Sequence, residues 1–167
     1  MKVLPYIETE NGYTLADEHM HQLWGLIDVE KTFYDGSIQT ADQFLAYMKG
    51  PLTFPLIVGN GRPMGLGWLT DIVPGRACLH FCILNAGKSV YEVGQAALDY
   101  WWSMGDVDSP LLYNLIGVTP ANNEMAVKFI RRLGFTTFPE VPGLMFDAYL
   151  GDRVPGIISY LGRPHGR

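Results

Sequence analysis

The sequence predicts a mixed α/β domain in which helices cover an incomplete sheet. Three observations support this prediction: helical apolar spacing in several segments, consecutive strand-like segments in the middle of the chain, and a composition suited to a core. Hydrophobic residues make up 48% of the 167 residues and charged residues 17%. A chain with this composition can bury a substantial core, which excludes disordered, collagen-like and coiled-coil proteins.

The charge balance is acidic, with 17 Asp and Glu against 12 Lys and Arg and a formal net charge of −5. Nucleic-acid binding depends on basic patches, and the sequence has no dense cluster of Lys and Arg, so no nucleic-acid partner is expected. No apolar run approaches the roughly 18 residues of a membrane span, so no membrane is expected either. The opening residues lack a signal-peptide pattern, and the expected location is the cytoplasm.

The two cysteines, Cys78 and Cys82, lie in the apolar run ACLHFCIL. In a strand, four residues place them roughly 13 Å apart on one face. A disulfide needs Cα atoms within about 7 Å. We therefore expect reduced core thiols, as in a reducing compartment. The same spacing argues against convergence on a metal ion, and no metal site is expected.

The N-terminal third predicts an edge strand followed by two helices. A first strand is expected at Lys2–Ile7, and apolar residues recur at three- and four-residue spacing over Asp17–Lys31. Thr40 with Gln43 three residues later forms a capping box, which starts the second helix. That helix stops at Gly50-Pro51.

A three-stranded meander is expected next. The apolar runs PLIVGN and MGLGWLTDI flank Asn60-Gly61, and Asn-Gly between apolar runs is a strong hairpin signal. A second turn, Val73-Pro74-Gly75-Arg76, leads into ACLHFCIL as the third strand.

The period then becomes helical after Ser89, which we expect to be an N-cap. The run LLYNLIGV predicts a buried strand, and a further helix starts at Asn122 or Asn123 and ends at Gly134. A closing strand pair is expected over Phe135–Glu140 and Leu144–Leu150. The apolar tail Val154–Leu161 either adds a strand or meets a second subunit in a homodimer, and the sequence leaves both open.

The join between ACLHFCIL and the following helix is a candidate anion site. Gly87, Lys88 and Ser89 precede the helix, whose free N–H groups and positive dipole end attract anions. The functional interpretation is a phosphate-bearing cofactor, and the alternative is a simple turn and cap. A P-loop is excluded because Cys82 stands where its first Gly is required.

The segment TPANNEMAVKFIRRLGF resembles the GNAT superfamily of acyl-CoA-dependent N-acetyltransferases. In that family an Asn after the fifth strand opens a helix that ends in Gly-Phe, and here Gly134-Phe135 follows Asn123 eleven residues later. The order of elements over Tyr6–Leu150 is also similar to the family's. The resemblance implies one acyl-CoA-binding domain over residues 1–167, with 151–167 as a C-terminal extension. It also implies a mostly antiparallel mixed sheet, splayed between strands 4 and 5 and flanked by about four helices.

The resemblance implies acetyl-CoA as the co-substrate, held where the strands Ala77–Leu84 and Leu111–Val118 splay apart. Its pantetheine would pair with exposed strand backbone, and its pyrophosphate would lie on the loop before the central helix. The family's glycine-rich loop is replaced here by Asn85 to Gly94. The implied cofactor-binding residues lie on the strand, the loop and the late helix: Phe81, Cys82, Ile83, Leu84, Lys88, Ser89, Val90, Asn123 and Phe129.

His80 is the candidate general base, because it lies beside the expected gap and has an ordinary pKa of about 6.5. A buried, hydrogen-bonded core histidine is the alternative. Glu30 and Tyr34 lie in DVEKTFYDG, where the family builds its acceptor-side wall, and they are further candidates together with Asp71. Many relatives have a Tyr seven residues after the Asn as the acid for the leaving thiolate, and that position is Ile130 here.

The expected function is transfer of an acetyl group from acetyl-CoA to a primary amine by direct attack. The acceptor is a small molecule or a protein amine. The replaced glycine loop and Ile130 motivate the alternative of a catalytically silent GNAT-fold protein that serves in binding or assembly.

Overall fold

One sheet of eight strands organises the computed structural model, which describes residues 1–106 and 109–164. Its spatial order is β1 (Lys2–Pro5), β4 (Phe54–Gly59), β5 (Pro63–Val73), β6 (Gly75–Ile83), β7 (Leu112–Pro120), β10 (Asp152–Gly162) and β8 (Thr136–Thr137), with β9 (Val141–Asp147) also paired to β10. Neighbouring strands are antiparallel except β6 and β7, which are parallel. This is the mixed, mostly antiparallel sheet that the family resemblance implies.

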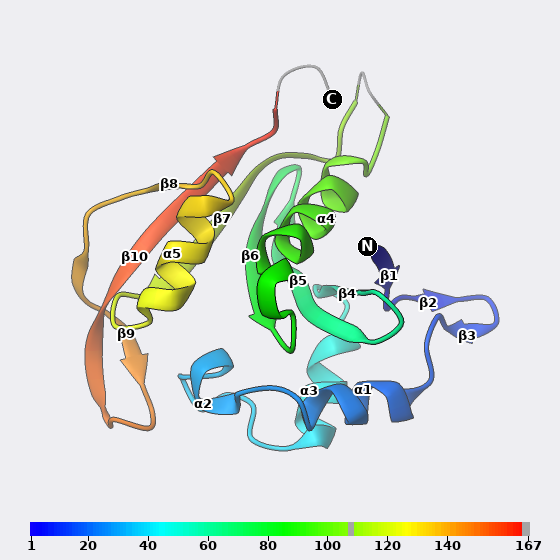
Figure 1. Ribbon diagram of the computed structural model, residues 1–167, viewed down its shortest axis with the longest axis horizontal. Helices are drawn as coiled ribbons and strands as arrows, with labels where there is room; N and C mark the ends of the chain where they lie inside the picture. Colours follow the sequence, from blue (N-terminus) through cyan, green and yellow to red (C-terminus); the bar gives the residue numbers. More distant parts are fainter. Residues whose placement is uncertain (107–108, 165–167) are drawn as a thin grey trace.

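The described part of the chain has five α-helices around the sheet: α1 (Asp17–Trp24), α2 (Val29–Thr32), α3 (Ala41–Met48), α4 (Val90–Trp102) and α5 (Glu124–Arg132). Figure 1 shows α4 and α5 in front of the sheet and α1, α2 and α3 below it. A small hairpin of β2 (Glu8–Thr9) and β3 (Gly12–Tyr13), which the sequence analysis did not anticipate, lies beside α1.

The segment MGLGWL in β5 explains how helices reach both faces of the sheet. Because strand residues alternate between faces, Gly65 and Gly67 lie under α4, whereas Leu66 and Trp68 face α1 and α3. A Cβ atom on Gly67 would lie 2.7 Å from the buried ring of Trp101. The two glycines therefore allow α4 to approach the sheet closely.

Two hydrophobic cores result, one on each face of the strands β4 to β6. The first packs α4 and α5 against the sheet around Trp101, which is 0% exposed. The second packs α1 and α3 against the opposite face around Phe44 and Trp68. The central strands are thus covered on both sides.

The meander of β4, β5 and β6 confirms the predicted turns, and Gly61 adopts the left-handed conformation that the hairpin requires (φ 74°). The predicted capping box of Thr40 is also confirmed, with Thr40 Oγ1 accepting from the Gln43 N–H at 3.2 Å. Asn123 is the N-cap of α5, and Gly134 follows the end of that helix with φ 95°. Local signals were sufficient for these elements.

The single helix predicted over Asp17–Lys31 is wrong. The chain forms α1, leaves the helix at Gly25, and starts α2 with Asp28 as a new N-cap that accepts from the Lys31 N–H. The apolar spacing runs through both helices, so it gave no sign of the break.

Ser89 occupies the N-cap position of α4, as predicted, but its side chain does not cap the helix. Gly87–Ser89 forms a 3₁₀ turn that runs directly into α4, and the Ser89 hydroxyl caps no helical N–H. Its ψ of 17° differs from the extended conformation in which a capping side chain reaches back to the helix.

The predicted closing strand pair is wrong in its pairing. β8 and β9 each pair with β10 instead of with each other, and β10 also pairs with β7 from Gly156 to Gly162. The tail Val154–Leu161 therefore adds a strand, which settles one of the two alternatives left open by the sequence. Residues 165–167 of the expected extension lie outside the described residues.

Candidate functional site

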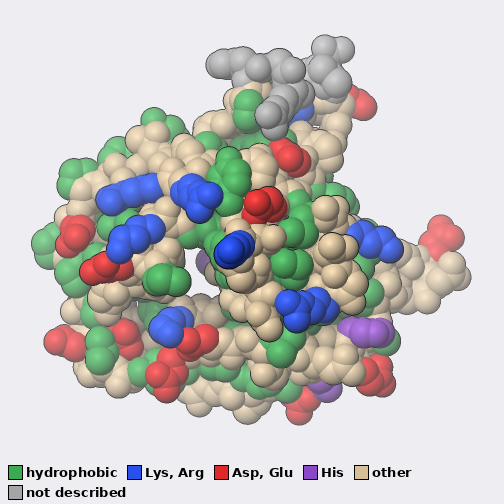
Figure 2. Space-filling model, in the orientation of Figure 1, with side chains coloured by type: hydrophobic (Ala, Val, Ile, Leu, Met, Phe, Trp, Pro, Cys, Tyr) green, Lys and Arg blue, Asp and Glu red, His purple; other side chains and the backbone are tan. Residues whose placement is uncertain are grey.

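The strands β6 and β7 part in the middle of the sheet. Their parallel ladder runs from Gly75 and Leu112 to the pair Cys78 and Ile116, where it ends. Beyond this point β6 continues to Ile83 beside β5, and β7 continues to Pro120 beside β10. Figure 2 shows an opening in the surface between the part that carries α5 and the part that carries β6 and α4. The gap expected between strands 4 and 5 of the sequence analysis is confirmed.

The orientation of the β6 backbone follows from its pairing with β5. The Leu84 N–H donates to the Met64 carbonyl at 3.0 Å, and backbone groups of alternate residues face the same side of a strand. Cys82 therefore also faces β5, whereas Phe81 and Ile83 direct their backbone groups towards the gap. No described strand pairs with them there, so this edge can accept an extended ligand as an added strand does.

The vertex of the gap is formed by Gly117 on β7. A Cβ atom there would lie 3.8 Å from the Leu79 carbonyl of β6 and 3.0 Å from Ser159 Oγ of β10. The absence of a side chain at Gly117 leaves the vertex open just beyond the last strand pair. His80 is the residue that follows Leu79 on β6.

Two cationic side chains lie near the first turn of α4. Lys88 is exposed in the 3₁₀ turn, and the guanidinium of Arg132, from α5, lies 5.1 Å from the ring centroid of Tyr91 in α4. Cations beside a helix N-terminus favour the binding of phosphate groups. The sequence analysis missed Arg132, although its place three residues after Phe129 puts it beside the helix face that packs against α4.

α4 and α5 meet across the gap on one face of the sheet. The ring of Phe129 packs edge-on against Phe81 at 5.4 Å, and a Cβ atom on Gly94 would lie 2.7 Å from Phe129. Asn123 accepts the Ala126 N–H through Oδ1 at 3.2 Å, which fixes the start of α5 beside β7. Of the two predicted residues of this helix, Phe129 therefore packs against β6, and Asn123 starts the helix directly after β7.

His80 lies on the other face of β6, opposite α4. Its ring stacks on Trp68 with centroids 5.2 Å apart and planes 7° from parallel, and its Nε2 is 2.9 Å from Thr70 Oγ1. Burial lowers the pKa of His80 below its ordinary value, and the carboxylates of Asp71 and Asp35 oppose this shift. A histidine with a lowered pKa is neutral near pH 7 and can accept a proton.

Asp71 occupies an unusual backbone position next to His80. Among the described residues it is the one non-glycine with a positive φ, 48°, and it lies where the pairing of β5 with β6 is irregular between Thr70 and Val73. Burial raises the pKa of the Cys78 thiol, and the hydrogen bond between that thiol and Asp71 raises it further. Strained backbone of this kind is concentrated at functional sites.

The remaining predicted residues lie at the edge of this region. Tyr34 is half-buried after α2, and burial raises its pKa. Glu30 is exposed on α2, and the carboxylates whose charges act on His80 are Asp71 and Asp35. Cys82 is buried and its sulfur accepts a hydrogen bond from Thr32 Oγ1 at 3.4 Å, so its side chain points away from α4.

A shallow depression of about 550 Å³ lies between β1 and α4, at the opposite edge of the sheet from β7. No residue of the predicted site lines it. Within residues 1–106 and 109–164, no group of three or more His, Cys, Asp or Glu side chains could hold a metal ion, and no helix has the length and hydropathy needed to cross a membrane.

No protein-family model matches this chain, and no curated protein matches it in sequence. Several solved structures are similar to it in fold. A mutant of the spermidine N-acetyltransferase SpeG from Vibrio cholerae has a TM-score of 0.73 and 13% identity, covering 98% of this chain and 95% of its own. Spermidine N-acetyltransferase from the same organism in complex with CoA and spermine has a TM-score of 0.70 and 15% identity, covering 96% and 95%.

A third similar structure, smu.2055 from Streptococcus mutans, has a TM-score of 0.69 and 15% identity, covering 98% of this chain and all (100%) of its own. At such identities the likeness establishes the fold, over almost the whole chain. The chain has the GNAT fold that the segment from Thr119 to Phe135 suggested.

Proposed function

From this fold and the geometry of the gap, we propose that the protein is an N-acetyltransferase that transfers the acetyl group of acetyl-CoA to a primary amine. The observation that carries the proposal is the parting of β6 and β7 directly beside His80, with the backbone of Phe81 and Ile83 unpartnered by any described strand. A strand edge of this kind fits the amides of pantetheine. Similar structures described as spermidine N-acetyltransferases, one of them with CoA, add support.

Acetyl-CoA bound in the gap would supply an activated acetyl group as a thioester. The backbone groups of Phe81 and Ile83 would hold the pantetheine, while Lys88 and Arg132 would neutralise the diphosphate near the first turn of α4. Asn123, which caps the start of α5, would lie near the thiol end. The basic side chains Lys88 and Arg132 replace the family's glycine-rich loop in this proposal.

His80 would act as the general base. In the tautomer in which Nε2–H donates to Thr70, Nδ1 carries a free lone pair and can take a proton from the acceptor ammonium. The neutral amine would then form the new N–C bond as the C–S bond breaks. The nitrogen would release its second proton to solvent, the released thiolate would take a proton from solvent, and His80 would return its own proton to solvent. Positioning of the amine supplies much of the rate, and the base contributes about 10²–10⁴-fold.

Cofactor binding is tested first, by the melting temperature of the purified protein with and without acetyl-CoA. A ligand present at about 100 times its Kd stabilises the folded state by about 2.7 kcal/mol, which raises the melting temperature of a chain of this size by roughly 5–10 °C. An unchanged melting temperature at that excess would remove the cofactor from the proposal. A shift without acetyl transfer to any amine would favour the binding or assembly alternative.

Catalysis is tested with His80→Gln, which we expect to lower kcat by about 10²-fold or more while acetyl-CoA still raises the melting temperature. His19→Gln, at an exposed position on α1, is the matched control and should leave kcat unchanged. Because burial lowers the pKa of His80, the wild-type rate should fall at acid pH with a midpoint below the ordinary histidine pKa of about 6.5, as the imidazole gains its proton. A rate in His80→Gln equal to that of the wild type would exclude His80 as the base.

A further inference from the structure

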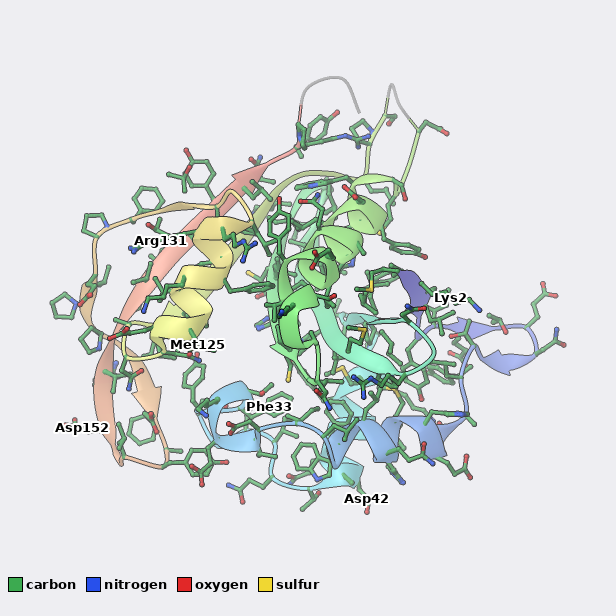
Figure 3. The ribbon with its side chains drawn as sticks, viewed as in Figure 1. Lys2, Phe33, Asp42, Met125, Arg131 and Asp152 are labelled. Atoms are coloured by element: carbon green, nitrogen blue, oxygen red, sulfur yellow. The ribbon has the colours of Figure 1, made fainter. Side chains whose placement is uncertain are left out.

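Four aromatic rings pack together on the face of the sheet that is turned away from α4. Trp68 is central: it stacks on His80 at 5.2 Å and on Phe33 at 5.8 Å, and its Nε1 donates to the Tyr47 hydroxyl at 3.3 Å. Phe33 and Trp68 are buried, whereas His80 and Tyr47 are partly exposed. Figure 3 places Phe33 between α2 and the central strands. The two buried rings thus hold the two accessible ones in place.

Two carboxylates lie beside the accessible rings. Asp71, from β5, directly follows Thr70, whose hydroxyl is 2.9 Å from His80 Nε2, and Asp35, from the loop after α2, lies two residues after Phe33. The charges of both act on His80 and on Tyr47. Neither is among the ion pairs formed by the described residues. We call Phe33, Asp35, Tyr47, Trp68, Asp71 and His80 the aromatic–acidic cluster. It presents two carboxylates and the faces of aromatic rings on one side of the sheet.

Asp35 and its loop are held in position from the other side of the gap. The Tyr34 carbonyl accepts the N–H of Ala148, in the turn after β9, at 2.8 Å. Gly36, with φ 72°, packs so closely that a Cβ atom on it would lie 2.9 Å from the Ala148 Cβ. Asp35 itself accepts from the Ser37 N–H and hydroxyl. These contacts fix the loop that carries the Asp35 carboxylate.

The aromatic–acidic cluster lies at the vertex of the gap. His80 is two residues beyond Cys78, where the β6–β7 ladder ends, and its side chain points to the face opposite α4 and α5. The proposed acyl donor occupies the gap between the strands. An acceptor held by the cluster would therefore approach the thioester from the α1–α3 side of the sheet.

We infer that the aromatic–acidic cluster binds the acceptor, and that this acceptor is an aliphatic amine with a second cationic group. The inference rests on the proposed acetyl transfer and names its substrate class. One ammonium would lie at His80 and give up its proton there, while a second would remain charged between a carboxylate and the Tyr47 ring. Cations are attracted both to carboxylates and to the faces of aromatic rings. A substrate carboxylate would be repelled by Asp35 and Asp71.

The test compares putrescine with butylamine, which has the same carbon chain and one positive charge. Charge-assisted hydrogen bonds contribute about 1.5–3 kcal/mol, so we expect putrescine to exceed butylamine by about tenfold or more in kcat/KM, measured by release of CoA thiol. Asp71→Asn and Asp35→Asn should each raise the KM for putrescine by about tenfold, and should raise it by a larger factor than the KM for butylamine, which lacks the second cationic group. Asn tolerates the left-handed backbone of residue 71, so the first variant should fold.

Asp42→Asn is the matched control, because Asp42 is an exposed carboxylate on the outer side of α3 (Figure 3). It should change neither KM. Binding of putrescine to the complex with CoA, measured by titration calorimetry, gives a readout independent of turnover, and Asp71→Asn should weaken it about tenfold.

The outcomes separate the two proposals. Equal kcat/KM for putrescine and butylamine would overturn the dicationic acceptor and leave acetyl transfer standing. Absence of transfer to every amine would overturn the proposed function, and the calorimetric Kd would still decide the acceptor surface. Putrescine binding that is unchanged in both Asp variants would remove the aromatic–acidic cluster from recognition.

Discussion

The two halves of the sheet on either side of the gap differ in how they are covered. β1, β4, β5 and β6 have α4 on one face and α1 and α3 on the other, and their core residues Leu56, Leu66 and Trp101 are fully buried. β7, β8, β9 and β10 are covered mainly by α5. Several of their large apolar side chains remain exposed: Val118 (47%), Phe138 (50%), Phe146 (49%) and Tyr160 (41%).

Because of this difference, one half of the sheet supports the proposed catalytic groups and the other half leaves the gap accessible. The groups proposed for chemistry, above all His80, stand on the half that is packed on both faces, where two cores fix the backbone. The thinner half contributes α5, which Asn123 caps and whose Arg132 lies over the Tyr91 ring of α4. The well-packed half can hold the base in a fixed position, and the less covered half can leave room for the ligand to enter. An active site needs both properties.

The largest expected effect contrasts the cores of the two halves. Trp101→Ala removes a fully buried ring and should lower the free energy of unfolding by about 3–5 kcal/mol. Phe146→Ala removes a half-exposed ring from β9 and should lower it by about 0.5 kcal/mol or less. Urea denaturation followed by circular dichroism measures both. Equal losses would show that the two halves are equally well packed.

A medium effect is expected where the two halves meet. The Cβ atom in Gly94→Ala would approach Phe129 to 2.7 Å and Leu133 to 2.8 Å, which forces α4 and α5 apart. Overpacking of this kind costs about 1–3 kcal/mol of unfolding free energy, and the Kd for acetyl-CoA should rise in parallel. Gly151→Ala is the control, because its Cβ would meet nothing within 4 Å and it lies in the β9–β10 turn; its positive φ costs some stability, but acetyl-CoA affinity should be retained. Loss of affinity in both variants would contradict the proposed role of the α4–α5 contact.

The smallest effect compares two helix caps, one in each half. Thr40→Ala and Asn123→Ala each remove one side-chain cap and should each cost about 1 kcal/mol, measured by thermal unfolding. Only Asn123→Ala should also raise the KM for acetyl-CoA, because α5 borders the gap and α3 does not. A matching change in KM for Thr40→Ala would mean that both variants act through general stability.

The predictable parts of this molecule are those specified by neighbouring residues. The Asn60-Gly61 hairpin, the Thr40 capping box and the Asn123 cap each depend on a few adjacent side chains, and each is present in the structure. The pairing of β10 with β7 could not be predicted from the sequence. It joins residues that are 42 positions apart, such as Gly117 and Ser159, through backbone contacts that leave no local sequence pattern. The break between α1 and α2 was hidden because the same apolar spacing serves both helices.

The site was predictable in outline and less so in its chemistry. His80 and the strand beside the gap were identifiable from alternation along ACLHFCIL. Asp35, Tyr47 and Trp68 were not, because they come together through tertiary packing from a loop, a helix and a different strand. The contact between Arg132 on α5 and Tyr91 on α4 joins residues that are 41 positions apart in the sequence, so it was not predictable either. The expected homodimer and the roles of Glu30 and Tyr34 stay predictions.

The hydrogen bond between Tyr34 and Ala148 joins the two halves at a second point, below the gap. This hydrogen bond and the β6–β7 ladder close the gap at its two ends, so the gap is open only at the two faces of the sheet. If the donor and the acceptor enter from opposite faces, neither blocks the release of the other. Such a layout suits sequential kinetics, in which both substrates are present before either product leaves.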